Sequence, residues 1–297
     1  MFLLFFCQKN KYLCSWIMEE NVITSVQNAR IKHVVALQQK SSLRREEGLF
    51  VVEGQREIEH CIACGYEIVE MYLRSEECGV RSENTPAADI PHSTIVSPQV
   101  YEKMAYRGST EGVIAVAKCK DHSLSSLLTP HSTLLGKTTP LIVVLESVEK
   151  PGNLGAILRT AEAAHVDAVI VCDPLTDLYN PNLIRASIGG VFSVPVVVCT
   201  SQECIAFLKE RKIRILTAQL QDSYDYYDYD MRQATAIVMG TESTGLSQQW
   251  RDAADVHIRI PMLGRLDSLN VSVSAAILMY EAVRQRNKVY QYPDAKM

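Results

Sequence analysis

Short apolar runs in the second half of the chain constrain the fold most strongly. Residues 141–145 read LIVVL and residues 168–172 read AVIVC, with no polar side chain other than one thiol. A strand made of apolar residues must be covered on both faces, whereas a half-exposed strand alternates apolar and polar residues. Further, mostly apolar runs follow between helical patterns at 194–198, 213–218, 236–240 and 256–260, and a final helix is expected at 272–287. We therefore expect an α/β fold with a mainly parallel sheet and helices on both faces.

The first half of the chain predicts a smaller α/β domain, and 297 residues are enough for two domains. Between the halves, residues 121–140 are dominated by Ser, Thr, Leu and Pro, which indicates a linker. The expected domains are therefore 19–120 and 141–297. In the first domain, helices are expected at 28–45, at 54–64 and from Ser97-Pro98, and strands at 49–52, 68–73 and 112–117.

The first 18 residues require a separate interpretation. The first seven are apolar, but Lys9 and Lys11 then interrupt the run. A membrane-spanning helix needs about 20 apolar residues, and a signal peptide carries its positive charges before the apolar run. We expect residues 1–18 to be a disordered tail, or to precede a start at Met18.

Charge and cysteine content narrow the functional classes. A formal net charge of -4 excludes RNA binding through a large overall positive charge. Nine cysteines in an odd, unpatterned set indicate reduced thiols and a cytoplasmic protein. Cys61 and Cys64 form a lone CxxC inside a helical pattern. We expect half-buried helix thiols there rather than a redox or zinc site, and no metal in the protein.

In parallel sheets ligands bind beyond the carboxyl ends of the strands. The first such segment, 146–160, holds Gly152 and Gly155 but lacks the G-x-G-x-x-G of dinucleotide-binding proteins. Asn153 is expected to cap the helix that follows. Arg159 lies among apolar residues of that helix. Its charge is expected to point toward the strand ends, unless it forms a structural ion pair.

Two more predicted strands are followed directly by segments rich in polar residues and glycine. Gly240 and Gly245 bracket Glu242 directly after a strand, and glycines there let a ligand approach the backbone closely. Ser268 and Asn270 lie in the loop before the final helix. Each feature alone has a structural explanation, as a turn or as a helix cap. Three such ends in one half of the chain indicate a ligand site.

These segments resemble the three motifs of the SpoU/TrmH ribose 2'-O-methyltransferases, a branch of the SPOUT superfamily. The matching text is PGNLGAILRTAEAAHVDAVIV, IVMGTESTGLS and IPMLGRLDSLNVSVSAAILMYEAVR, and the resemblance covers about 141–290. The segment RIKHVVALQQKSSLRREEGLFVVEGQREIEHCIACGYEI also resembles the RNA substrate-binding domain that precedes the catalytic domain in many members. His165 and Ser274 depart from the family pattern at positions without a chemical role.

The resemblance implies a catalytic domain with a deep trefoil knot between about 213 and 280, and a homodimer through that domain. The first domain would be a small ribosomal-protein-like (L30e-like) α/β fold. The cofactor would be S-adenosyl-L-methionine, held largely by backbone groups. The implied cofactor-binding residues are Thr217, Ala218, Gly240, Ile260, Met262 and Leu269.

The implied reaction is 2'-O-methylation of a ribose in structured RNA, and we expect 23S-type ribosomal RNA rather than transfer RNA as the target. Because a guanidinium stays protonated in proteins, we expect Arg159 to bind an RNA phosphate and stabilise the developing alkoxide, not to act as a base. The residues that match the family's functional polar set are Asn153, Arg159, Glu242, Ser268 and Asn270.

RNA contacts are also expected from the first domain. The stretch 28–45 carries basic residues and no acidic one, which suits phosphate contacts, although a solvated helix face would have the same composition. The segment 222–230 alternates Tyr and Asp, and we expect it to pack as a loop near the knot or dimer interface. The expected RNA-binding residues are Arg30, Lys32, Arg44, Arg45 and Arg56.

Two other functions remain open from the sequence. A non-catalytic RNA-binding relative would keep the fold, but it would not need Arg159, Glu242 and Asn270 together. A nicotinamide-dependent oxidoreductase would use Asp173, which follows the second strand, to bind a ribose. The missing glycine fingerprint and the third motif weigh against that enzyme class.

Overall fold

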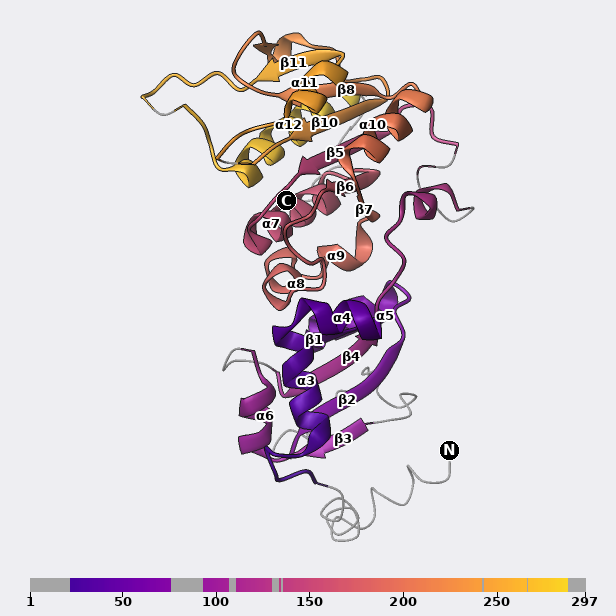
Figure 1. The fold of residues 1–297 in the computed structure, drawn as a ribbon, viewed down its shortest axis with the longest axis vertical. Coiled ribbons are helices and arrows are strands. Elements are labelled where there is room, and N and C mark those ends of the chain that lie inside the picture. The colour runs from indigo at the N-terminus through magenta and orange to yellow at the C-terminus, as the bar shows by residue number, and fades with distance from the viewer. Residues whose placement is uncertain are drawn as a thin grey trace, which may run out of the picture. The chain divides into compact units, whose positions relative to one another are not determined.

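The computed structural model describes residues 22–75, 93–106, 111–129, 134, 136–241, 243–265 and 267–287. The chain divides into two compact units, residues 1–120 and residues 121–297 (Figure 1). Across these described ranges, no helix combines the length and apolar character that crossing a membrane requires.

The first unit is a four-stranded sheet with helices. Its strand order is β1-β4-β2-β3, in which β4 runs antiparallel to both neighbours and β2 pairs with β3 in parallel. Ile31, Val34 and Leu37 pack α3 onto the sheet from successive turns of the helix. The elements are α3 (Ala29–Gln39), α4 (Ser41–Glu47), β1 (Leu49–Glu53), α5 (Gln55–Ala63), β2 (Ile68–Arg74), β3 (Ser93–Val96), α6 (Pro98–Met104) and β4 (Val113–Lys118).

Local signals explain most boundaries of this unit. Asn28 caps α3, because its Oδ1 accepts a hydrogen bond from the Arg30 amide at 2.9 Å. Ser97 caps α6, with Pro98 in the first turn as the sequence predicts. The expected single helix at 28–45 is two helices, because the chain is extended at Lys40. Strand β3 was not predicted.

The second unit is a seven-stranded parallel sheet in the order β7-β6-β5-β10-β8-β11-β9. All six predicted strands are present, and the α/β class with a parallel sheet is confirmed. The elements are β5 (Leu141–Glu146), α7 (Pro151–Ala163), β6 (Ala168–Cys172), α8 (Pro181–Ser187), α9 (Gly190–Ser193), β7 (Val196–Cys199), α10 (Ser201–Glu210), β8 (Arg214–Ala218), β9 (Tyr224–Asp225), β10 (Thr235–Met239), α11 (Gln248–Ala253), β11 (Val256–Arg259) and α12 (Val271–Arg286).

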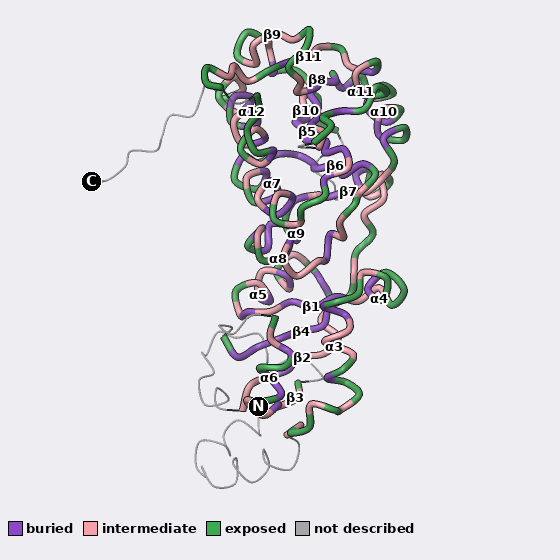
Figure 2. The backbone as a smooth tube through the Cα atoms, turned by 60° about the vertical axis from the view of Figure 1, so that its left-hand side comes forward, coloured by how far each residue is buried: buried purple, intermediate pink, exposed green. Residues whose placement is uncertain are grey.

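Helices cover both faces of this sheet, as the unbroken apolar strands require (Figure 2). On one face, alternate strand residues such as Ile142 and Val144 pack with Phe207 of α10 and Trp250 of α11. On the other face lie α7, α8 and α12 (Figure 1). Gly155 lets α7 approach α8 closely, since an added Cβ would lie 2.6 Å from that of Ala186.

Four features of the second unit differ from the sequence prediction. Asn153 is not the cap of α7: the helix begins at Pro151, with Lys150 as its N-cap, because Pro suits the first helical position. Helices α8, α9 and α11 were not predicted. The expected linker 121–140 contains a 3-10 helix, Leu124–Leu128, whose Leu127 is buried in the core of the second unit.

The fourth difference is the Tyr–Asp segment, which was expected to be a loop. Its Tyr224–Asp225 form the edge strand β9 beside β11. Arg259 of β11 donates from Nε to Asp225 Oδ1 at 2.7 Å, which ties this edge to the sheet.

The end of α12 is fixed by one side chain. Arg286 donates hydrogen bonds to the carbonyl oxygens of Thr139, Met231 and Gln233, at 2.7, 2.9 and 2.6 Å. The last helix is therefore joined to the segments that precede β5 and β10.

Candidate functional site

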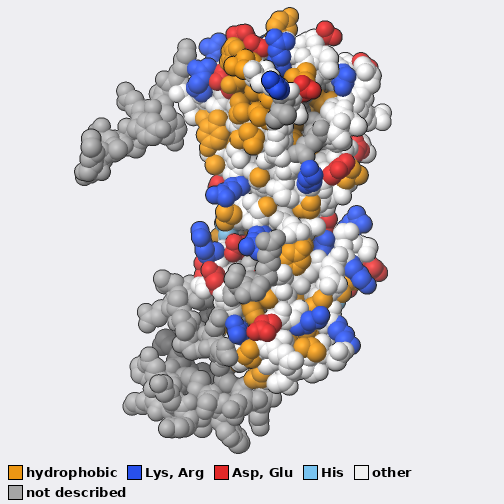
Figure 3. All heavy atoms as spheres, turned by 90° about the vertical axis from the view of Figure 1, so that its left-hand side faces the viewer, with side chains coloured by type: hydrophobic (Ala, Val, Ile, Leu, Met, Phe, Trp, Pro, Cys, Tyr) orange, Lys and Arg blue, Asp and Glu red, His pale blue; other side chains and the backbone are white. Residues whose placement is uncertain are grey.

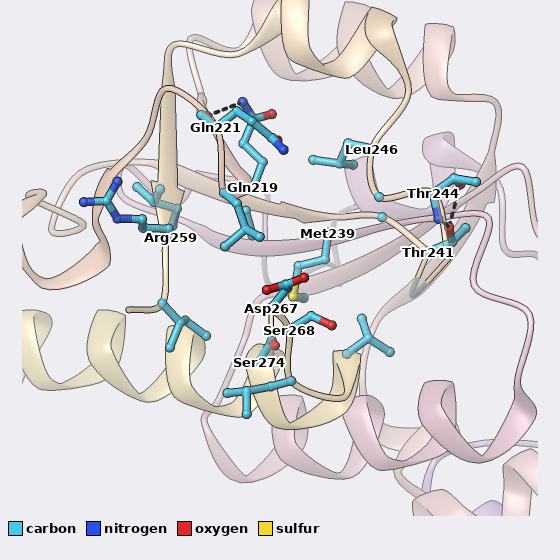
Figure 4. Close-up of a pocket in the computed structure, with 18 of the residues that line it drawn as sticks. Gln219, Gln221, Met239, Thr241, Thr244, Leu246, Arg259, Asp267, Ser268 and Ser274 are labelled. Carbon is cyan, nitrogen blue, oxygen red and sulfur yellow. Dashed lines mark hydrogen bonds between the residues drawn. The ribbon is translucent and has the colours of Figure 1, made fainter. Parts of the chain in front are cut away.

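A cavity of about 520 Å³ opens at the carboxyl ends of three neighbouring strands, β8, β10 and β11. Residues after these strands and the loop before α12 line it (Figure 4). The lining is mixed: Met239, Leu246 and Ile260 are apolar, while Asp267 and Ser268 are polar. This is the position at which open parallel sheets bind ligands, and the volume is in the range of small-molecule and cofactor sites.

The turn after β10 forms one wall of the cavity. Thr241 and Gly245 exchange backbone hydrogen bonds of 3.2 and 3.1 Å, so the chain folds back on itself directly after the strand. Gly240 is required by this close approach, because an added Cβ would overlap the Gly245 carbonyl and lie 2.5 Å from the Leu246 nitrogen. Thr241 and Thr244 hydroxyls are 2.8 Å apart across the turn (Figure 4).

The opposite wall is the loop that leads into α12. Figure 4 shows the Met239 side chain directed toward the part of this loop that carries Asp267 and Ser268. Asn270 ends the loop as the N-cap of α12, and its Oδ1 accepts from the Ser272 amide at 3.0 Å. Its Nδ2 donates to Asn153 Oδ1 at 3.2 Å, which joins the start of α12 to the first turn of α7.

A second hollow, of about 320 Å³, adjoins the first. It shares Gly240, Thr241 and Val271 with the larger cavity. Lys150 and Asn153, at the start of α7, lie on its other side. Two adjoining hollows at the strand ends suit a reaction in which one small molecule donates a group to another.

Most of the expected cofactor-binding residues lie in the larger cavity. Five of the six expected residues line it: Ala218, Gly240, Ile260, Met262 and Leu269. Thr217 does not line it. Its side chain is fully buried, and its Oγ1 lies 2.6 Å from Nδ1 of His257, the residue opposite it on β11. Thr217 therefore joins β8 to β11 within the sheet.

The expected catalytic residues are only partly brought together. Ser268 lines the larger cavity, Asn153 lines the smaller one, and Asn270 lies beside Asn153. Arg159 is exposed on α7 and lines neither hollow. Glu242 lies outside the described residues.

Four of the five expected RNA-binding residues are exposed: Arg30, Lys32, Arg45 and Arg56. Arg30 also lies 3.5 Å from the Glu70 carboxylate and donates to the Thr94 hydroxyl at 3.0 Å. Arg44 departs from the prediction. It is buried, and its Nη1 donates to the carbonyl oxygens of Leu37 and Gln38, at 2.5 and 3.0 Å. Its charge therefore caps the last turn of α3 instead of facing RNA.

Sequence reasoning missed several cavity residues. Arg251 of α11 lines the cavity and donates from Nε to the Leu246 carbonyl at 3.2 Å. Gln219 and Gln221 follow β8 and lie on the same rim (Figure 4). The sequence could have indicated the two glutamines, because they directly follow strand β8. Nothing in the sequence indicated Arg251, because it lies within a short helix and does not directly follow a strand.

Two protein families match this chain. The SpoU rRNA Methylase family matches residues 140–280, and the MRM3-like substrate binding domain matches residues 28–115. A putative TrmH family tRNA/rRNA methyltransferase of Staphylococcus epidermidis is 38% identical over 149 residues, which is 50% of this chain and 60% of that relative. The chain thus spans less than two thirds of that relative's length.

Solved structures match nearly the whole chain. A crystal structure of an RNA 2'-O ribose methyltransferase is 36% identical, with a TM-score of 0.75, and the match covers 89% of this chain and 98% of that one. The chain belongs to the SpoU rRNA methylase family. A second solved structure, an AdoMet-bound rRNA methyltransferase from Sinorhizobium meliloti, is 26% identical, with a TM-score of 0.78 over 88% of this chain and 97% of that one. Both predictions, of the SpoU family and of S-adenosyl-L-methionine as its cofactor, are confirmed.

Proposed function

We propose that this SpoU family member transfers a methyl group from S-adenosyl-L-methionine to a ribose 2'-hydroxyl in structured RNA, with 23S-type ribosomal RNA rather than transfer RNA as the substrate. The observation that carries the proposal is the pair of adjoining hollows at the carboxyl ends of β8, β10 and β11. The ribosomal target is supported by the family that matches residues 140–280 and by the rRNA methyltransferase from Sinorhizobium meliloti.

The larger cavity fits the cofactor by size and by its donor set. Its walls combine apolar side chains, such as Leu246 and Ile260, with backbone groups at strand ends and with the polar loop at 267–270. When bound, the cofactor supplies an electrophilic methyl group. Leu269 and Met262 would hold its apolar parts, while Gly240 keeps the turn after β10 close enough to form the wall.

The smaller hollow is the proposed site of the ribose. Asn153 lies on its wall, and Asn270 holds the Asn153 side chain in one orientation. Ser268 would touch the ribose from the loop between the two hollows. Glu242 belongs to the same proposed set. Arg159, with its exposed planar guanidinium, would bind an RNA phosphate and stabilise the charge that develops on the 2'-oxygen.

The first unit is the proposed RNA-binding part. The exposed basic residues there are Arg30, Lys32, Arg45 and Arg56. Contacts between such residues and phosphates weaken at higher salt concentration, because binding releases counterions from the RNA. The affinity for RNA should therefore fall as the salt concentration rises, and it should be lost when residues 19–120 are deleted. Binding that does not depend on salt would contradict this role.

We also propose a homodimer through the second unit. Large apolar side chains are exposed there, including Leu263 at 98% and Tyr280 at 49%, and Figure 3 shows hydrophobic side chains gathered on one face of this unit. Sedimentation should give a dimer, and Val273→Glu on the exposed side of α12 should shift it toward the monomer. The trefoil knot and the L30e-like fold of the first unit stay predictions of the resemblance.

A methyl-transfer assay tests the function. Protein, S-adenosyl-L-methionine with a tritiated methyl group, and 23S-type or transfer RNA are incubated, and 2'-O-methylation is mapped by resistance to alkaline cleavage. We expect label in the ribosomal RNA only. Arg159→Lys keeps the positive charge but loses the planar guanidinium, which can bind a phosphate through two N–H groups at once. The substitution should therefore lower the rate of methyl transfer. Calorimetric binding of NAD without binding of S-adenosyl-L-methionine would overturn the proposal.

A further inference from the structure

Three cysteine side chains of the second unit converge on one point. The sulfur atoms of Cys172, Cys199 and Cys204 all lie within 4.8 Å of one another. Cys172 and Cys204 are fully buried, and Cys199 is half-buried. Within the described ranges, no other set of three His, Cys, Asp or Glu side chains comes together in a way that suits a metal ion.

The parallel sheet itself brings two of these thiols together. Cys172 ends β6 and Cys199 ends β7, and the two residues are register partners in adjacent parallel strands. Partners in register place their side chains on the same face of a sheet, about 5 Å apart. Cys204 comes from α10, the helix that immediately follows β7 and covers that face.

A hydrogen-bond network fixes the start of α10 over the ends of these strands. The Asp173 carboxylate, next to Cys172, accepts from the amide and the hydroxyl of Ser201, at 3.1 and 2.6 Å. The Ser201 hydroxyl in turn accepts from the Trp250 indole at 2.9 Å. Thr200 and Glu203 complete a capping box at the same helix end. The three thiols are thus held in place by a rigid surrounding shell, as metal ligands require.

We propose that Cys172, Cys199 and Cys204 form a three-thiolate site for Zn²⁺. Thiolates select soft and borderline metal ions over Mg²⁺ or Ca²⁺. Zn–S bonds of about 2.3 Å require sulfur atoms about 3.8 Å apart, so the side chains need to move by only about 1 Å. Water would supply the fourth ligand from the side of Cys199, the one half-buried thiol of the three. This site departs from our sequence-based expectation that the protein binds no metal.

The proposed ion has a structural role and is independent of the methyl-transfer proposal. Strands β6 and β7 form the end of the sheet away from β8 and β11, which hold the cofactor-sized cavity. Zinc would join α10 to β6 and β7 through three bonds. Each thiol loses its proton on binding, so up to three protons are released for each ion.

The test uses the full chain, reduced with a phosphine and dialysed against Zn²⁺. We expect about one zinc per chain by elemental analysis, proton release in weakly buffered solution, and a higher unfolding temperature with zinc than with a chelator. Cys199→Ser should remove all three effects. Cys61→Ser/Cys64→Ser in the first unit is the matched control and should keep them.

Cobalt gives a second readout that does not depend on stability. Co²⁺ bound to the wild-type chain should show thiolate-to-cobalt charge-transfer absorption, and this absorption should be lost in Cys199→Ser and in Cys204→Ser. The proposal is overturned by substoichiometric zinc in the wild type, by zinc retained in these variants, or by zinc lost in the Cys61/Cys64 control. A Cys172–Cys199 disulfide in the reduced, metal-treated protein would also overturn it.

Discussion

The side-chain Nδ2 of Asn270 donates to Oδ1 of Asn153 at 3.2 Å, across 117 residues of sequence. The same Asn270 side chain caps α12 by accepting from the Ser272 amide. One residue therefore fixes the starts of α7 and α12 where the two hollows meet. These two bonds use different atoms of Asn270, so substitution can separate them.

Asn270→Asp should keep the cap and lose the donor. A carboxylate still accepts from the Ser272 amide, but it cannot donate to Asn153. We expect stability close to wild type and a loss of methyl transfer of about 100-fold, because small displacements of positioning groups have effects of this size. Asn270→Ala should lose about 1 kcal/mol of stability as well. Equal activity of Asn270→Asp and wild type would show that the bond to Asn153 has no part in catalysis.

Gly240→Ala should damage the cavity through steric overlap alone. The new Cβ would overlap the Gly245 carbonyl in the turn after β10. We expect a loss of about 1–3 kcal/mol in the free energy of unfolding, the range for overpacked sites, and weaker binding of S-adenosyl-L-methionine by calorimetry. Gly152→Ala is the control, because an added Cβ there has no neighbour within 4 Å. If both variants behave alike, close approach is not the reason for Gly240.

Arg44 and Arg45 are adjacent, but their substitution by alanine should affect different properties of the protein. Arg44→Ala leaves two carbonyl oxygens at the end of α3 without their donor, so we expect a loss of about 1–3 kcal/mol in the free energy of unfolding. Arg45→Ala should leave stability unchanged and weaken RNA binding, because Arg45 is exposed. Denaturant unfolding and a filter-binding assay measure the two effects. The reverse pattern would restore Arg44 as an RNA contact.

Glu281 should make stability depend on pH. Hydrogen bonds from Arg284 lower the pKa of Glu281, and Gln285 lowers it further. A carboxyl whose folded pKa is depressed stabilises the fold above its unfolded pKa and loses this effect as the pH falls through the folded pKa.

Glu281→Gln should therefore lower the free energy of unfolding at pH 7, by less than about 1 kcal/mol because Arg284 is exposed. The difference between variant and wild type should shrink as the pH falls below the usual glutamate pKa of about 4.3. Urea unfolding at several pH values measures it. A difference that stays constant with pH would assign the effect to packing.

The sequence predicts those parts of the fold that local chemistry determines. The apolar runs identify six strands of the parallel sheet, and Thr200 with Glu203 marks the start of α10. Strands β3 and β9 are short edge strands whose pairing depends on distant partners, so their own residues carry little signal.

The direction of individual side chains was less predictable. Arg44 and Arg45 look equivalent in sequence, yet the break at Lys40 turns one of them back onto α3. Arg251 reaches the cavity from a helix of the apolar core, and only the tertiary fold brings it there. The convergence of the three cysteines was equally hard to predict, because it depends on the register of β6 with β7.

The position of Arg286 has a consequence for the order of events during protein synthesis. It bonds the Thr139 carbonyl, 147 residues earlier, and β5 pairs with β10, so Leu141 meets Thr235. The ribosome makes β5 long before either partner exists. A nascent chain therefore holds β5 with one neighbour missing until β10 has been made, and the Arg286 bonds form only after nearly all of α12 has emerged. Such long-range pairing is slow and exposes apolar surface.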